Sequence, residues 1–119
     1  MRRDLDLMRE IMLDARASSH PLDVSTWTGE GRSRSLVGYN VKLLRDAGMV
    51  EADIHGADDD PYFFCQVGDL TWEGQDYLAS IAPTSVWRET KRLLARRGGD
   101  AAWAVIKALA ARAAESLGL

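Results

Sequence analysis

Hydrophobic positions between residues 33 and 50 repeat with the period of a helix that has one buried face. Val37, Val41 and Leu44 follow one another at intervals of four and three residues and form an apolar stripe. Gly48 comes next, and glycine commonly ends a helix in a left-handed conformation. Residues 50–54 then alternate between apolar and polar side chains, as a half-buried strand does. We expect a central helix, a tight stop at Gly48 and the first strand of a β-hairpin.

The remaining pattern predicts a mixed α+β chain with the order α-β-α-β-β-α-α-α. The expected elements around the central helix are a helix over 4–15, a short strand over 22–27, hairpin strands over 50–55 and 62–70, a helix over 72–81, a helix from 84 to the glycines at 98–99, and a last helix after Asp100. The side chains expected to cap the last three helices are Thr71, then Thr84 or Ser85, and Asp100.

The succession of helix, stop and hairpin resembles the second half of a winged helix-turn-helix domain. We therefore expect a winged-helix-like domain (α-β-α-β-β-α) over residues 1–82. Two C-terminal helices over residues 83–119 would pack on it in one compact unit or form a dimer interface. A full helix-turn-helix has another helix before the central one, and the segment before residue 33 leaves little room for it.

Composition indicates one globular domain, because the chain has 119 residues, of which 46% are hydrophobic and 28% charged. It contains no apolar run of transmembrane length, so we expect a cytoplasmic protein with no membrane partner. The single cysteine, Cys65, excludes an internal disulfide and is interpreted as a small buried side chain. His20 and His55 have no metal-ligand spacing, and we expect no cofactor.

Nothing in the sequence indicates catalysis. The pair Gly29 and Gly31 lacks the third glycine of a dinucleotide-binding loop. The acidic run 58–60 lacks the alternate spacing and the final glutamate of a calcium loop. We therefore expect a protein that is not an enzyme.

Charge is unevenly distributed along the chain. Residues 58–81 contain six acidic residues and no Lys or Arg, whereas residues 82–119 contain seven basic and three acidic residues. Segregation of this kind bears on binding partners and not on the fold.

The basic residues around the central helix favour DNA binding. Ser35, Gly38, Lys42 and Arg45 are predicted on its polar side, and a recognition helix presents such residues to bases and phosphates. The same pattern is also compatible with a solvated helix face. The hairpin is acidic and is expected to point away from DNA, because phosphates repel it. The candidate DNA-binding residues are Arg32, Arg34, Ser35, Lys42 and Arg45, with Arg88 and Arg92 on a second basic helix.

A protein-interaction module is the alternative. The acidic hairpin would dock on a host nucleoprotein or defence complex where nucleic acid normally lies. Tryptophan is enriched at interface hot spots. The basic helix over 88–97 would equally suit the acidic hairpin of a neighbouring copy, and the alanine-rich stripe of the last helix would suit a homodimer. The candidate residues for protein interaction are Asp58, Asp59, Asp60, Trp27 and Trp72.

Four segments together resemble an uncharacterised family of small bacterial and phage proteins. The segments are residues 1–9, 38–48, 70–74 and 98–107. The resemblance implies a mobile-element setting and a winged-helix-like fold, but no activity. The histidine expected in the central helix of that family is replaced here by Asn40. The preferred hypothesis is a non-enzymatic DNA-binding regulator encoded by a phage or mobile element, with duplex DNA as partner and a homodimer through the C-terminal helices.

Overall fold

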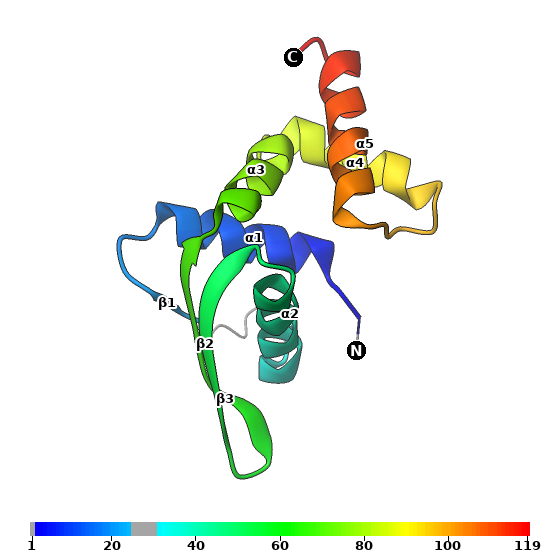
Figure 1. Cartoon of the computed structure of the whole chain (residues 1–119). Helices are drawn as coiled ribbons and strands as arrows, with labels where there is room; N and C mark the ends of the chain where they lie inside the picture. Colours follow the sequence, from blue (N-terminus) through cyan, green and yellow to red (C-terminus); the bar gives the residue numbers. More distant parts are fainter. Residues whose placement is uncertain (1, 25–30) are drawn as a thin grey trace. The chain divides into compact units, whose positions relative to one another are not determined.

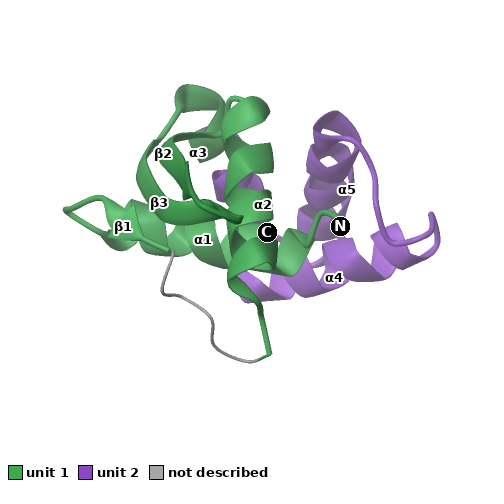
Figure 2. Cartoon of the chain, turned by 90° about the horizontal axis from the view of Figure 1, so that it is seen from below, with its two compact units in different colours: residues 1–75 green, residues 76–119 purple. Residues whose placement is uncertain are grey.

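The computed structural model describes residues 2–24 and 31–119. The chain forms two compact units, Met1–Gln75 and Asp76–Leu119 (Figure 2). The division falls inside a helix, earlier in the chain than the predicted boundary between residues 82 and 83.

The order of elements confirms the predicted α-β-α-β-β-α-α-α succession and the mixed α+β class (Figure 1). The first unit contains α1 (Leu5–Ala17), β1 (Leu22–Asp23), α2 (Arg34–Asp46), β2 (Val50–Ala57), β3 (Asp60–Leu70) and the first turn of α3 (Trp72–Ile81). The second unit contains the rest of α3, α4 (Thr84–Ala95) and α5 (Trp103–Ser116). β1 is shorter than the predicted strand, whose last three residues lie outside the described part of the chain.

Helix α1 begins at a side-chain cap and is anchored to α2. The Leu7 amide donates a hydrogen bond of 3.0 Å to the Asp4 carboxylate, as an N-cap requires. The Asp4 amide in turn donates to the Asn40 side-chain oxygen at 2.8 Å, and the Asn40 amide group donates to the Leu36 carbonyl at 2.9 Å. Asn40 is fully buried, so its hydrogen-bonding groups need such partners. This residue therefore joins the start of α1 to the middle of α2.

Helix α2 ends at Gly48, as predicted. Gly48 has φ +76°, its amide donates to the Arg45 carbonyl, and the Met49 amide donates to the Leu44 carbonyl, both at 2.9 Å. These two bonds form a Schellman motif, which satisfies carbonyls that the helix end leaves unpaired. The chain then enters β2 directly.

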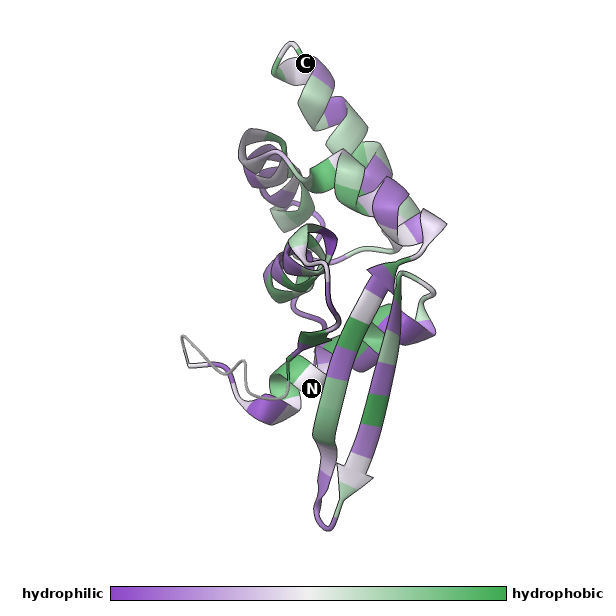
Figure 3. Cartoon of the chain, turned by 90° about the vertical axis from the view of Figure 1, so that its left-hand side faces the viewer, coloured by the Kyte–Doolittle hydropathy of each residue, from purple (hydrophilic) through white to green (hydrophobic). Residues whose placement is uncertain are grey.

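Strands β2 and β3 form a long antiparallel hairpin, and β1 adds to the other edge of β3, giving the order β1-β3-β2. Apolar and polar residues alternate along the two hairpin strands (Figure 3). The register changes between the pairs His55/Phe64 and Ala57/Asp60, so that residues 61–63 lie opposite Gly56 alone. Such a bulge changes which face of the sheet a side chain points to.

The hairpin closes at its base on α3. The Thr71 hydroxyl donates to the Gly48 carbonyl, and its oxygen accepts from the Gly74 amide at 3.0 Å. The Thr71 amide donates to the Met49 carbonyl at 3.0 Å. A Cβ on Gly74 would lie 1.9 Å from the Met49 carbonyl oxygen, so only glycine permits this approach. The predicted Thr71 cap and the predicted close approach at Gly74 are both confirmed.

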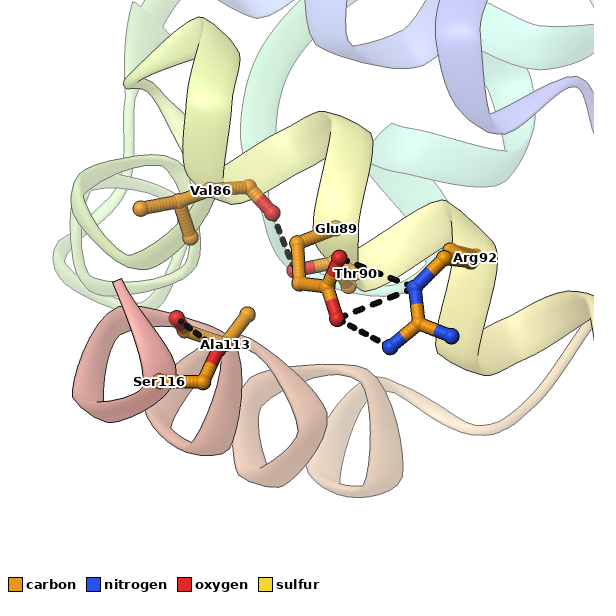
Figure 4. Close-up of polar contacts among 6 residues, drawn as sticks. All are labelled: Val86, Glu89, Thr90, Arg92, Ala113 and Ser116. Carbon is orange, nitrogen blue, oxygen red and sulfur yellow. Dashed lines mark hydrogen bonds and ion pairs between the residues drawn. The ribbon is translucent and has the colours of Figure 1, made fainter.

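In the second unit, α4 and α5 pack against each other through their apolar faces. The predicted inward residues Val86, Trp87 and Thr90 are buried, and the Thr90 hydroxyl donates to the Val86 carbonyl at 2.7 Å (Figure 4). Tyr77 and Trp103 meet edge to face with ring centroids 4.6 Å apart. The alanine-rich stripe of α5 is also buried, at Ile106, Leu109, Ala110 and Ala113.

The predicted caps of the last two helices are wrong. The residue before α4 is Pro83 and the residue before α5 is Ala102, and neither provides a side-chain hydrogen bond. Pro83 is suited to its place because a helix start leaves the first amides unpaired anyway. The Asp100 carboxylate accepts instead from the neighbouring Ala101 amide at 2.9 Å, one turn before α5 begins.

Candidate nucleic-acid interface

The predicted basic residues lie on the solvent side of α2 and at its start. Ser33 caps the helix, its hydroxyl oxygen accepting from the Leu36 amide at 3.0 Å. Arg34, Ser35 and Lys42 are exposed, whereas Arg32 and Arg45 are half-buried. Arg34 and Lys42 are eight residues apart, or about 12 Å along a helix. The opposite side of α2 is buried through Val37, Asn40, Val41 and Leu44.

Gly38 does not belong to this polar side, so its predicted position there is wrong. It is buried beneath the Tyr62 ring, and a Cβ at Gly38 would lie 2.3 Å from the ring's Cγ. The bulge at residues 61–63 turns Tyr62 toward α2. Glycine at this position therefore allows the hairpin to pack directly on the helix backbone.

Each basic side chain at this surface lies beside a carboxylate. Arg34 Nη1 is 2.6 Å from Asp60 Oδ2, and Lys42 Nζ is 3.0 Å from Asp46 Oδ2. Arg45 also approaches Asp46, at 3.5 Å. The fourth pair joins Arg32 to Glu10 of α1 at 2.5 Å. The net charge of the surface is consequently much lower than the sequence of α2 suggests.

The pair between Arg34 and Asp60 places the acidic hairpin beside the start of α2. Asp60 Oδ1 also accepts from the Tyr62 amide at 3.0 Å, so both of its oxygens are engaged. The hairpin runs beside α2, and its turn extends past the N-terminal end of the helix (Figure 1). Its base therefore does not point away from the basic residues.

These contacts lower the pKa values of the carboxyl groups. The pKa of Asp60 is lowered chiefly by its hydrogen bond from Arg34 and next by the Tyr62 amide. The pKa of Asp46 is lowered chiefly by its hydrogen bond from Lys42. Both carboxylates are accordingly ionised at neutral pH, and both partners keep their positive charge. Because the pairs are exposed, a competing anion can replace either carboxylate at little cost.

The remaining predicted basic residues lie in the second unit. Arg88 and Arg92 are exposed on α4. Arg92 forms a bidentate ion pair with Glu89 one turn earlier (Figure 4). This pair raises the pKa of Arg92 and lowers that of Glu89.

The residues predicted for protein interaction differ in their surroundings. Asp58 and Asp59 are exposed in the hairpin turn, and Asp58 has φ +51°. Trp72 has 81% of its surface exposed at the start of α3 and is thus outside the core. Trp27 lies outside the described residues.

Sequence reasoning missed two features of this region. One is Phe63, which has 58% of its surface exposed although it lies in an apolar run that suggested a buried strand. The other is Asp60, which was assigned to the acidic turn but contacts Arg34. A possible signal was the proline after Asp60, since Pro inside a strand indicates a bulge or an edge.

The described residues show no arrangement that would support metal binding. Within residues 2–24 and 31–119, no three His, Cys, Asp or Glu side chains gather as metal ligands. Cys65 is fully buried, which confirms its interpretation as a small core residue, and this burial raises its pKa to about 11. Across the same residues, none of the helices combines the length and the apolar character needed to span a membrane.

The structure thus defines a mixed α+β protein in which an exposed basic helix lies beside an acidic hairpin. Residues 2–100 match the family described as "Hypothetical protein (DUF2513)", and the chain belongs to this family. An uncharacterised protein of Haemophilus influenzae is 29% identical over 111 residues, which cover 92% of each chain. No solved structure matches. The predicted membership of an uncharacterised family is confirmed.

Proposed function

We propose that the chain is a non-enzymatic, winged-helix-like protein that binds duplex DNA through α2. Its strand order β1-β3-β2, with the hairpin directly after α2, is the arrangement expected of a winged helix. The observation that carries the proposal is the exposed side of α2, where Arg34, Ser35 and Lys42 are presented to solvent. Side chains of this kind at the start of a recognition helix bind phosphates and bases.

The carboxylates beside these cations determine what kind of binding to expect. Exposed ion pairs contribute little to stability, so DNA phosphates can displace Asp46 and Asp60. The exchange still reduces the net gain, because each displaced carboxylate remains nearby and repels the phosphate. We therefore expect weak binding that is lost steeply as salt increases.

Fluorescence anisotropy with a labelled duplex of mixed sequence, at about 20 mM salt, tests the proposal. Lys42→Ala and Arg34→Ala should both weaken binding, whereas Lys107→Ala on α5 should not. Absence of binding by the natural chain at low salt would refute DNA binding. Equal losses in all three variants would indicate attraction by net charge and not by α2.

The wider role that we propose is that of a regulator encoded by a phage or another mobile element, acting in the cytoplasm as a homodimer through the C-terminal helices. Because the alanine-rich stripe of α5 is already buried within the second unit, such a dimer would use other side chains of these helices. Sedimentation equilibrium of the full chain measures whether a dimer forms.

Docking on a protein complex is the second candidate, and exposed aromatic residues favour it. Phe63 and Trp72 are largely exposed in an acidic region that contains no Lys or Arg between residues 47 and 87. Aromatic residues surrounded by charge are typical of interface anchors. A host nucleoprotein complex should be captured by the natural chain but lost with Trp72→Ala and with charge reversal at residues 58–60. Retention by both variants would contradict this candidate.

A further inference from the structure

The sheet has one face on the core and one open face. Paired residues of antiparallel strands share a face, and the register pairs Asp23 and Asp53 with Gln66 from its two sides. The next pair on the same face is His55 and Phe64, whose ring centroids are 5.5 Å apart. We call this the outer sheet face, and its residues are Asp23, Glu51, Asp53, His55, Phe64, Gln66 and Gly68.

The outer sheet face carries negative charge without compensation from its own strands. β1, β2 and β3 contain no Lys or Arg, so the open face is not the mixture of charges that a solvated sheet normally shows. Among the described residues, neither Glu51 nor Asp53 forms an ion pair. Like charges close together on a sheet destabilise it, so this arrangement is unfavourable unless a cation is supplied from elsewhere.

The face is also hollowed. One hollow of about 270 Å³ lies over Glu51, Asp53 and Gln66. A second, of about 290 Å³, lies between the end of α1 and the sheet and includes Asp69. Both are lined by Glu51 and Gly68, so they adjoin, and neither is lined by Lys or Arg. Gly68 keeps the floor low because it has no side chain.

A surface of opposite charge is present on the same chain. Arg88, Arg92 and Arg96 follow one another at intervals of four residues along α4 and its C-cap, with Lys91 beside them, and all four are exposed. Successive members of this α4 basic stripe are separated by about 6 Å along the helix axis. Glu51 and Asp53 are two residues apart on one strand face, or about 6.6 Å. The two surfaces therefore match in sign and in spacing.

We propose that the outer sheet face binds the α4 basic stripe of a second copy of this chain. Both partners of this contact are visible on the described residues, whereas nucleic acid would be repelled by the same carboxylates. The contact uses neither α2 nor its ion pairs, and so does not depend on DNA binding. It also gives the self-association through the C-terminal helices a defined counterpart on the first unit.

Sedimentation velocity of the full chain tests the proposal at about 50 and about 500 mM salt, since screening weakens contacts between exposed charges. The natural chain should have a mass above the 13.2 kDa of one chain at low salt and should approach that mass at high salt. Asp53→Lys should raise the apparent dissociation constant at least about tenfold, because it places like charges together. Asp59→Lys, which changes net charge equally in the hairpin turn, should have much less effect.

A mixing experiment identifies the two surfaces as partners. A chain with Glu51→Lys and Asp53→Lys should not self-associate, and neither should a chain with Arg88→Glu and Arg96→Glu. An equimolar mixture of the two should associate again, because each variant then meets the opposite charge. Arg112→Glu on α5 is the matched control for the helix variant and should behave like the natural chain.

Three results would overturn the proposal. A single-chain mass for the natural protein at all concentrations excludes self-association. Association that survives both charge-reversed variants excludes these surfaces. Failure of the mixture to associate, with both variants folded by circular dichroism, excludes their pairing. None of these results bears on duplex binding, which is measured separately by anisotropy.

Discussion

Replacing Asp60 with asparagine isolates the contribution of one ion pair to the basic surface. Asp60 Oδ1 accepts from the Tyr62 amide, while Oδ2 accepts from Arg34. In Asp60→Asn the oxygen that accepts from Tyr62 is retained, and the oxygen bound to Arg34 becomes an NH₂ group that cannot accept. The turn geometry and the packing of Tyr62 on Gly38 should persist, while Arg34 is released.

The expected gain follows from the number of phosphate contacts. Each phosphate contact adds about 0.9 to the slope of log K against log salt concentration. One added contact by Arg34 corresponds to about tenfold tighter duplex binding at about 50 mM salt and to about fourfold at about 200 mM. The variant should therefore bind more tightly than the natural chain and depend more steeply on salt.

Anisotropy titrations at several salt concentrations measure both quantities. Asp59→Asn removes the same charge from the adjacent position, which is exposed and has no ion pair among the described residues, and should change affinity by less than about twofold. Equal gains in the two variants would show that only net charge matters and would refute the reasoning. Weaker binding by Asp60→Asn would show that the pair positions Arg34 for DNA instead of masking it.

Three further predictions concern the fold. Gly74→Ala should lower the free energy of unfolding by about 3 kcal/mol in urea titrations, because its methyl group meets the Met49 carbonyl; Gly68→Ala, with ordinary contacts only, should change it little. Because the pKa values of Asp46 and Asp60 are lowered from 3.8, their ionised forms stabilise the fold above that pH, and stability should fall as pH drops through the lowered values. Replacing both with asparagine should flatten this fall in urea titrations at a series of pH values. The Cys65 thiol, with its pKa raised from 9.0 to about 11, should react with a disulfide reagent at pH 8 at least about a hundredfold more slowly in the native chain than in urea; similar rates would show that it is not buried.

The parts of the fold that the sequence predicted correctly are those set by local chemistry. The stripe of α2 and the left-handed residue at Gly48 follow from helical period and glycine geometry. Thr71 and Gly74 were also recognisable, because a capping hydroxyl and a missing Cβ act within one turn. The order of elements was predictable for the same reason.

The features that escaped prediction depend on residues far apart in the chain. Arg34 and Asp60 are 26 positions apart, and nothing local indicates that they meet. Gly38 reads as a solvent-facing helix residue until the bulge places Tyr62 over it. Net charge summed along α2 likewise overestimates its positive surface, because Glu10 and Asp60 come from other elements.

The two bonds that Thr71 makes to Gly48 and Met49 hold the two ends of the hairpin together. Everything between these residues is therefore an excursion that leaves from and returns to a fixed point. Residues inserted or deleted at its tip would leave α2 and the first turn of α3 in register. The helical base is thereby insulated from changes at the tip, so a family with this construction is free to vary what the hairpin recognises without rebuilding the domain.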